Sequence, residues 1–352
     1  MKTVFIIGAG ASAEAKLPTG RILKDKIASL LDIKFTDMFK ADLKSGDTTV
    51  VHAIRQYLQE NYGNQKAFDD YIQAARHIHD ALPQERSIDE FIDKQKENKR
   101  VALCGKLAII KAILEAERGS PLSELENNSS NFSPFVNTWY NPFFRLLIDE
   151  CRTFSDLRLR FESIVLIIFN YDRCIEYYLY HSLKNYYRFL SEAEVIELIK
   201  AIKIYHPYGM VGNLPWGGEK LKTKFGFDPN PKELLRLVPE IMTFTESIDR
   251  DRGRTDYKEM QMHMGKADKL VFLGFGFIPL NMKLLNSDGF PVNPLHKKCF
   301  ATRYGISDSD KDIIMNDIKK IFVSNLDISF NFLSKEKKCS DLFNEYERSL
   351  WF

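Results

Sequence analysis

His206 is the side chain in this sequence best placed for acid–base chemistry. It lies between the apolar segment Ala201–Tyr205 and a turn that contains Gly209. Imidazole titrates close to the pH at which most enzymes work, so a positioned histidine can take a proton from a reacting group. We therefore expect His206 to act as a general base. A satisfied structural histidine is the alternative, and the other six histidines show no metal-ligand spacing.

Asn170 and Asp172 follow another apolar segment, Ser163–Phe169. An asparagine amide can hydrogen-bond to the hydroxyls of a sugar and can orient a water molecule. Asp172 would lie beside it and contact the same substrate. Each residue also has a structural alternative, because asparagine is a favoured helix N-cap and an acidic residue in a first helical turn is stabilised by the helix dipole.

The segment Gly8-Ala9-Gly10-Ala11-Ser12-Ala13 follows the apolar run Val4–Ile7. A strand, a G-x-G-x-x-A loop and a helix start together place backbone N–H groups where a pyrophosphate can approach without meeting Cβ atoms. We expect this loop to hold a pyrophosphate; small residues that serve packing alone are the alternative. Asp32 has the spacing, about 20 residues, of the acidic strand-end residue in a redox dinucleotide fold. It follows a helix-like segment, which argues against a dehydrogenase.

A parallel sheet would bring these polar segments together. Apolar runs that stop at a glycine or a polar residue are typical of strands buried on both faces of such a sheet. Lys269–Gly274 is a fourth run of this kind, and Lys298–Thr302 and Lys320–Val323 are weaker strand candidates. Helices are expected at Ile22–Leu31 and Arg173–His181. The predicted fold class is α/β, a Rossmann-like parallel sheet flanked by helices, with a large helical insertion.

We predict one composite domain over residues 1–352. Its Rossmann-like core covers about 1–31 and 142–330, the helical insertion about 32–141, and a C-terminal extension about 331–352. Ser120–Pro134, rich in Ser, Asn and Glu, is predicted to be an exposed loop and is the segment best suited to disorder. Helical periodicity dominates the insertion, at Val51–Leu58, Ala67–Ile78, Ile88–Gln95 and Val101–Ala116.

The composition bounds the class of protein. Of 352 residues, 44% are hydrophobic, and 50 Lys and Arg against 48 Asp and Glu give a net charge of +2. This balance argues against a surface dedicated to nucleic acid, so the basic segments Lys94–Arg100 and Lys335–Lys338 rank last as functional sites. Five cysteines without a C-x-x-C pair indicate reduced thiols, and the longest apolar stretch, Ile164–Phe169, is far shorter than a membrane helix. We expect a cytoplasmic protein.

Taken together, four elements of the sequence resemble the sirtuin-like domains of bacterial antiphage defence systems. They are the glycine loop continued by Leu17–Gly20, Phe169-Asn170-Tyr171-Asp172, His206 at a strand end, and Gly274-Phe275-Gly276-Phe277 followed by Asn281. In sirtuins the similar elements are the cofactor loop, the T-x-N-Y-D segment, the catalytic histidine with its His-Gly turn, and a late strand end that closes over the cofactor. The resemblance covers Met1–Gly20 and about Ser163–Asn281.

Two departures from the sirtuin pattern shape what the resemblance implies. Protein-deacylating sirtuins carry a zinc module of two C-x-x-C pairs, which this chain lacks, so no zinc is expected. The histidine segment reads His206-Pro207-Tyr208-Gly209 instead of a direct His-Gly pair. The family members without the zinc module resemble NAD hydrolases. The implied activity is therefore an NADase that cleaves the nicotinamide–ribose bond and depletes cellular NAD in abortive infection.

The resemblance also implies roles for individual residues, with NAD as the substrate. Asn170, His206 and Asp172 would be catalytic, and no residue would bind a metal. Glu14 would face the sugar or favour a helix start, and Arg21 would reach a phosphate or be a solvated surface residue. The cofactor-binding residues would be Gly8, Ala9, Gly10, Ala11, Ser12, Glu14, Thr19, Arg21, Gly274, Phe275 and Asn281.

An NADase would need control, because constant activity would be lethal. We expect regulation through a homo-oligomer or a partner, for example a HerA-type ATPase or a short Argonaute, without membrane association or direct binding of nucleic acid. Two alternatives stay open. One is an NAD-dependent protein deacylase or ADP-ribosyltransferase, and the other is a non-catalytic module that binds NAD or ADP-ribose and signals by assembly.

Overall fold

The structure is a computed structural model. It describes residues 2–36, 42–61, 64–126, 131–218, 221–249, 255–287, 289–291, 296–322 and 327–351. Contacts divide the chain into two units. Unit 1 comprises Met1–Lys16, Ser120–Pro207 and Ile248–Phe352, and unit 2 comprises Leu17–Gly119 and Tyr208–Ser247.

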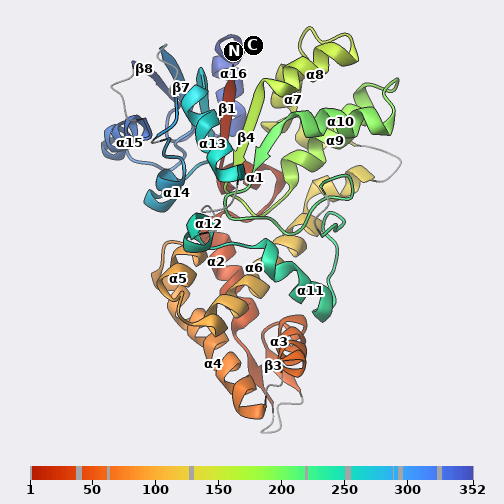
Figure 1. Ribbon diagram of the computed structural model, residues 1–352, viewed down its shortest axis with the longest axis vertical. Helices are drawn as coiled ribbons and strands as arrows, with labels where there is room; N and C mark the ends of the chain where they lie inside the picture. Colours follow the sequence, from red (N-terminus) through yellow and green to blue (C-terminus); the bar gives the residue numbers. More distant parts are fainter. Residues whose placement is uncertain are drawn as a thin grey trace. The chain divides into compact units, whose positions relative to one another are not determined.

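A six-stranded sheet forms the centre of unit 1 (Figure 1). All its strand pairs are parallel, and the strand order is β5-β4-β1-β6-β7-β8. Numbered along the chain, this is the order 3-2-1-4-5-6 of doubly wound dinucleotide-binding folds. The predicted Rossmann-like α/β fold is confirmed. The strands are β1 (Thr3–Ile7), β4 (Ile164–Ile168), β5 (Lys203–Tyr205), β6 (Lys269–Leu273), β7 (Lys297–Ala301) and β8 (Ile328–Phe332).

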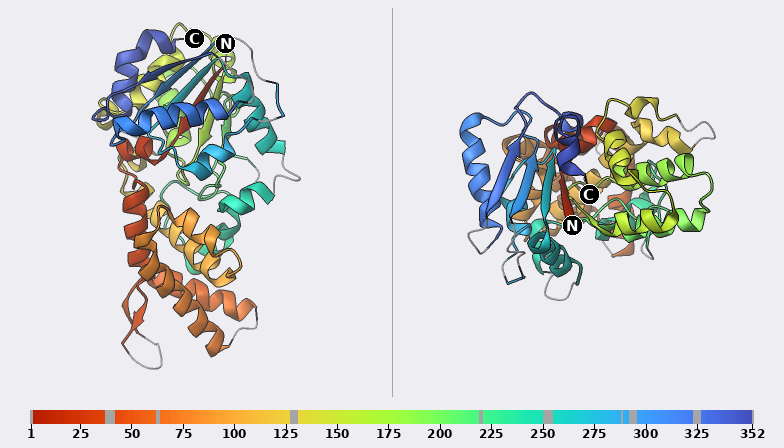
Figure 2. Two further views of the ribbon diagram at one scale, coloured as in Figure 1. Left: turned by 90° about the vertical axis from the view of Figure 1, so that its left-hand side faces the viewer. Right: turned by 90° about the horizontal axis from the view of Figure 1, so that it is seen from above.

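The three central strands explain the long apolar runs in the sequence. Every residue of β1, β4 and β6 is buried, because helices cover both faces of the sheet (Figure 2). Phe5 of β1 lies in register with Leu166 of β4 on one side and Val271 of β6 on the other. A strand covered on both faces has no solvent-facing side and therefore reads as continuous hydrophobic sequence.

The helices of unit 1 connect and cover these strands. The loop after β1 forms only one helical turn, α1, followed by a 3-10 turn, η1, before the chain enters unit 2. The elements of unit 1 are α1 (Ala9–Ser12), η1 (Ala13–Ala15), η3 (Pro121–Glu126), η4 (Ser133–Phe135), α7 (Tyr140–Ile148), α8 (Phe154–Glu162), α9 (Cys174–Tyr186), α10 (Glu192–Ala201), α13 (Thr255–Lys266), α14 (Pro279–Leu284), α15 (Asp308–Lys320) and α16 (Cys339–Leu350).

Unit 2 is mainly helical. Its helices begin at side-chain caps, among them Asp47, Asn64 and Ser87, each of which accepts a backbone N–H of the first turn. Its elements are α2 (Gly20–Leu31), β2 (Lys34–Phe35), β3 (Leu43–Ser45), α3 (Thr48–Glu60), α4 (Gln65–Ala81), η2 (Leu82–Gln84), α5 (Ile88–Lys94), α6 (Lys99–Gly119), α11 (Pro231–Leu237), η5 (Val238–Glu240) and the start of α12 (Phe244–Asp249).

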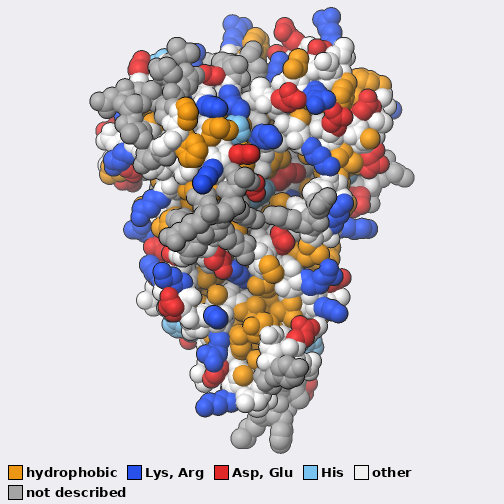
Figure 3. Space-filling view, in the orientation of Figure 1, with side chains coloured by type: hydrophobic (Ala, Val, Ile, Leu, Met, Phe, Trp, Pro, Cys, Tyr) orange, Lys and Arg blue, Asp and Glu red, His pale blue; other side chains and the backbone are white. Residues whose placement is uncertain are grey.

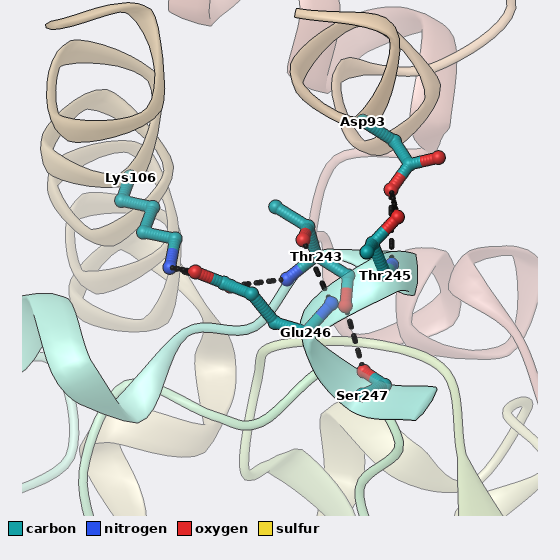
Figure 4. Close-up of polar contacts among 6 residues, drawn as sticks. All are labelled: Asp93, Lys106, Thr243, Thr245, Glu246 and Ser247. Carbon is teal, nitrogen blue, oxygen red and sulfur yellow. Dashed lines mark hydrogen bonds and ion pairs between the residues drawn. The ribbon is translucent and has the colours of Figure 1, made fainter. Parts of the chain in front are cut away.

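Helix α6 is the central helix of unit 2. It packs against α2, α3, α4, α5 and α11, and most of its residues are buried. The buried Lys106 on this helix forms an ion pair with Glu246 at the start of α12, with Nζ and Oε2 2.7 Å apart. The same carboxylate accepts from the N–H of Thr243, and Asp93 accepts from the N–H of Thr245 (Figure 4). Polar contacts thus fasten the returning segment Tyr208–Ser247 within unit 2.

Two expectations about single elements are wrong. A strand was expected at Lys320–Val323, but Lys320 is the last residue of the helix α15. The sixth strand of the sheet is β8 instead. Val323 lies outside the described residues. The buried residues Ile314, Ile318, Ile321 and Phe322 have helical spacing, so the apolar residues near 321 continue the buried face of α15 and do not start a strand. Residues 121–126 form a 3-10 helix with buried Leu122 and Leu125, so this part of the predicted loop is not exposed. Asn131, Ser133 and Pro134 are exposed as predicted, and 127–130 lie outside the described residues.

The division into units differs in detail from the predicted boundaries. Unit 2 begins at Leu17 and ends its first segment at Gly119, and it includes Tyr208–Ser247, which the sequence assigned to the core. Residues 331–352 contain the end of β8 and α16 and belong to unit 1. Asp32 is the C-cap of α2, and the short strand after it, β2, pairs only with β3. Within the described part of the chain, no helix has both the length and the apolarity for a membrane crossing.

Candidate functional site

The candidate site lies where four neighbouring strands of unit 1 end. β1, β4, β5 and β6 are followed respectively by Gly8, by Asn170 one residue beyond, by His206 and by Gly274. In open parallel sheets, ligands bind outside the carboxyl ends of the strands, where the strand order reverses. Here the order reverses between β1 and β6.

The glycines of the loop are explained by close packing of two strand ends. A Cβ at Gly8 would lie 2.6 Å from the carbonyl oxygen of Gly274, and a Cβ at Gly10 would lie 2.9 Å from the same oxygen. The N–H of Gly8 donates to Leu273 O, and the N–H of Gly10 donates to Gly274 O. These two N–H groups therefore already have protein partners, and the role of the loop in holding a pyrophosphate stays a prediction.

Ser12 and Asn170 meet across β1 and β4. The Asn170 Nδ2 donates to the Ser12 Oγ at 2.9 Å, and both residues are buried. A hydroxyl that accepts one hydrogen bond still has its own proton to donate. The pair predicted from separate motifs 158 residues apart is therefore in direct contact.

His206 connects Asn170 to a carboxylate. Its Nδ1 lies 3.2 Å from the main-chain oxygen of Asn170, and its Nε2 lies 2.7 Å from Oε1 of Glu176 in α9. Burial acts to lower the pKa of His206, but the ion pair with Glu176, the Asn170 carbonyl and the nearby Asp172 together raise that pKa above its ordinary value. The two carboxylates thus favour the protonated form of the imidazole.

Asp172 fixes the start of α9. Its Oδ1 accepts from the N–H of Cys174, the first residue of that helix, and its side chain is buried. The N-cap of α9 is Arg173, so Asn170 does not have the capping role that was its structural alternative. Asp172 lies one residue before the N-cap, Arg173, and therefore not in the first helical turn that its structural alternative required. It also contributes to the field at His206.

Glu14 is held by backbone groups from two other helical segments. Its Oε2 accepts from the N–H of Trp139 at 2.7 Å, and its Oε1 accepts from the N–H of Ser340 at 3.1 Å. Burial raises the pKa of Glu14, although these hydrogen bonds oppose the rise. The carboxylate thus ties η1 to the start of α7 and to α16.

The other predicted residues lie in four places. Ala9 and Ala11 belong to α1, where Ala11 O accepts from the Trp139 indole. Phe275 contacts Phe169 at a ring-centroid distance of 5.1 Å and so bridges the ends of β4 and β6, while Asn281 is half-buried in α14. Thr19 and Arg21, at the start of α2, belong to unit 2 and not to the cluster in unit 1.

Glu176 is the residue of this cluster that the sequence analysis missed. It lies in the first turn of α9, four residues after Asp172, and only 8% of it is exposed. An acidic residue early in a helix is ordinarily read as a favourable partner of the helix dipole. Only the packing of α9 beside β5 shows that this carboxylate faces His206.

A cavity of about 740 Å³ lies elsewhere, in unit 2, between α3, α4 and the connection from α5 to α6. Its wall includes Tyr57 and Tyr71, and Arg100 at its rim is paired with Asp70. On the face drawn in Figure 3, cationic and anionic side chains are interspersed, and hydrophobic side chains gather over unit 2. The charged residues that line the cavity are Lys94, Glu97, Lys99 and Arg100. The cavity contains none of the strand-end residues, so it does not enter the proposed function.

The cluster in unit 1 offers a hydroxyl, a carboxamide and an imidazole–carboxylate pair at adjacent strand ends. Such groups suit a polyhydroxylated substrate that develops positive charge as it reacts. Among the described residues, no group of three or more His, Cys, Asp or Glu side chains is arranged to hold a metal ion. No protein-family model and no curated protein matches the chain. Function is therefore inferred from this geometry together with the sirtuin resemblance.

Proposed function

We propose that the chain is a sirtuin-like NAD hydrolase. In this reaction the bond between C1′ of the ribose and the nicotinamide nitrogen breaks, and both bonding electrons leave with neutral nicotinamide. A water oxygen bonds to C1′, and one water proton passes to a base and then to solvent. The products are ADP-ribose, nicotinamide and a proton.

The observation that carries the proposal is the hydrogen-bonded series Ser12–Asn170–His206 across the carboxyl ends of β1, β4 and β5. These three residues were singled out by separate motifs, and they meet at the sheet edge where doubly wound folds bind nucleotides. In the proposal, Asn170 holds the ribose hydroxyls, Ser12 orients Asn170 and faces the pyrophosphate, and His206 receives the water proton. Little covalent assistance is needed, because the pyridinium is already a good leaving group.

The biological role follows from the resemblance and forms part of the proposal. NAD depletion in antiphage defence would require the enzyme to stay silent until triggered. We propose control by self-association or by a partner such as a HerA-type ATPase or a short Argonaute. The cytoplasm, where NAD is consumed, would be the site of action.

The test is a mass-spectrometric time course of the full chain with NAD, alone and with a partner encoded beside its gene. His206→Ala and Asn170→Ala are each expected to lower the rate at least about 100-fold, because base and positioning groups typically contribute that much. His296→Ala is the matched control, since His296 is an exposed histidine paired with Asp327. Wild-type rates in a folded His206→Ala variant would contradict the proposal, as would no release of nicotinamide under any condition.

One observation favours a second candidate, a non-catalytic NAD or ADP-ribose binding module. Both ring nitrogens of His206 already face protein acceptors. A binding module would give saturable ADP-ribose binding by calorimetry without turnover, and His206→Ala would leave its signalling intact.

A further inference from the structure

The pair formed by His206 and Glu176 assigns different tasks to the two imidazole nitrogens. We propose that Glu176 is a positioning residue that keeps the proton on Nε2 of His206, so that Nδ1 is the nitrogen that exchanges a proton during the reaction. The tautomer part of this inference stands on geometry alone. Its catalytic part rests on the proposed function.

The first support is the difference between the two contacts of the imidazole. The Nε2–Oε1 distance to Glu176 is 2.7 Å, whereas the Nδ1–O distance to the Asn170 carbonyl is 3.2 Å. The acceptor in the shorter contact is a carboxylate, and a hydrogen bond with an ionised partner is about twice as strong as one between neutral groups. Replacing the Asn170 contact by a water or a sugar hydroxyl is therefore the less costly change, and it opens Nδ1.

The second support is the burial of the pair. The side chains of His206 and Glu176 are 6% and 11% exposed. Oε2 of Glu176 is buried and has no hydrogen-bond partner within the described part of the chain. Carboxylates that serve packing alone ordinarily have both oxygens satisfied when buried. Here one oxygen is committed to His206, so the stabilisation of this buried carboxylate depends on the histidine.

The third support is the location of Nδ1. It faces the main chain of Asn170, the residue whose side chain contacts Ser12. Nδ1 is thus the imidazole nitrogen on the side of the strand-end cluster, and Nε2 faces α9. Asp172, from the connection between β4 and α9, also acts on the imidazole. Both carboxylates favour the protonated imidazole, so Nδ1 must lose a proton to solvent before it can act as a base.

The two imidazole nitrogens of His206 would handle their protons differently during the reaction. At the working pH, the Nδ1 proton leaves to solvent and the imidazole becomes the neutral Nε2–H tautomer. During hydrolysis Nδ1 takes the proton of the attacking water, and the proton returns to solvent after the product leaves. The Nε2 proton remains between His206 and Glu176 throughout.

The decisive measurement is a pH titration of the full chain labelled with ¹⁵N-histidine, followed by two-bond ¹H–¹⁵N correlation spectra. These spectra distinguish the two neutral tautomers, and a His206→Asn sample assigns the signals. In the wild type, neutral His206 is expected to carry its proton on Nε2. In Glu176→Gln its pKa is expected to fall by about one unit or more, and the neutral form is expected to shift toward Nδ1–H, because the Gln amide can donate to Nε2.

Kinetics supply the second readout. Glu176→Gln is expected to move the acid limb of the kcat profile to lower pH and to lower kcat by roughly 100-fold with a smaller change in KM, because an orienting carboxylate acts on the base rather than on substrate binding. Glu176→Asp keeps the charge and is expected to restore part of the rate. Glu192→Gln is the control, since that carboxylate bonds to Tyr180 and not to His206.

Two results would overturn the inference. One is a neutral wild-type His206 with its proton on Nδ1, a measurement that needs no variant and no activity. The other is an unchanged His206 titration in Glu176→Gln. If the spectra behave as expected but NAD is not hydrolysed, the assignment of the two nitrogens stands and the proposed function fails.

Discussion

Gly274 is the residue on which contact between the ends of β1 and β6 depends. Its φ is +56°, and a Cβ there would lie 2.0 Å from the backbone nitrogen of Ala11. Glycine is required for both reasons, since other residues seldom adopt this backbone conformation and a side chain would occupy the space of α1. The strand end can therefore approach the loop after β1 without any intervening side chain.

At this residue scale we predict that Gly274→Ala destabilises the protein by at least about 2 kcal/mol, the combined cost of a strained φ and of overpacking. Urea denaturation would measure the loss. Gly20→Ala is the matched control, because a Cβ at this first residue of α2 would meet nothing within 4 Å. A Gly274→Ala variant as stable as Gly20→Ala would contradict the packing described for the strand ends.

At the scale of elements, α6 shows how a buried helix tolerates charge. Lys106 and Lys111 are both less than a tenth exposed, yet each ammonium meets a carboxylate, Glu246 or Asp228, from the segment Tyr208–Ser247. Removing one partner of such a pair leaves a charge in a poorly solvated place, which costs more than the pair itself contributes. The ion pairs therefore specify where the returning segment lies within unit 2.

We predict that Glu246→Ala lowers the free energy of unfolding by about 1–3 kcal/mol, less than for a fully buried pair because the Glu246 side chain is 40% exposed. Adding Lys106→Met should recover part of the loss, since the variant no longer contains an unpaired buried ammonium. Glu162→Ala, which breaks the exposed pair with Arg158, should change stability by less than about 0.5 kcal/mol. Equal losses in Glu246→Ala and Glu162→Ala, measured by denaturation, would refute this account.

At the scale of the whole molecule, histidines that are shielded from solvent make stability depend on pH. Burial, with a smaller contribution from Lys184, lowers the pKa of His181 to about 4. Burial and the adjacent Lys2 lower the pKa of His263 to about 4 as well. The Nδ1 of His263 lies 2.8 Å from the side-chain Nζ of Lys2. Between pH 6.5 and 4 the unfolded chain binds protons that the folded chain does not, so stability falls as pH falls through this window. The raised pKa of His206 affects the free energy of unfolding in the opposite direction. Its stabilising contribution is present at low pH and is lost as pH rises through the pKa of the folded state.

We predict that His181→Gln reduces proton uptake on unfolding by up to one proton in this window. The readout is the slope of unfolding free energy against pH, obtained from denaturant titrations at several values from pH 7 to pH 4. His52→Gln, on the exposed side of α3, is the control. A His181→Gln slope identical to that of the wild type would show that His181 is not a source of acid sensitivity.

The parts of the site that were predictable are those fixed by strand ends. Ser12, Asn170 and His206 each follow an apolar run, and parallel strands bring their carboxyl ends to one edge, so their meeting follows from sequence and topology. Glu176 was not predictable, because the face that α9 turns toward β5 depends on tertiary packing. Packing was an open alternative for the glycine loop, but the partner of Gly8 was not predictable, since Gly274 is remote in the chain and the contact depends on strand order.

The central position of β1 also has a consequence for biosynthesis. The strand leaves the ribosome well before its two sheet partners, which begin at Ile164 and Lys269. At translation rates of roughly 5–20 residues per second, its first partner follows on the order of ten seconds later. A buried and mostly apolar strand therefore waits unpaired in the nascent chain, so overexpression in cells short of chaperones should yield inclusion bodies more readily than folded protein.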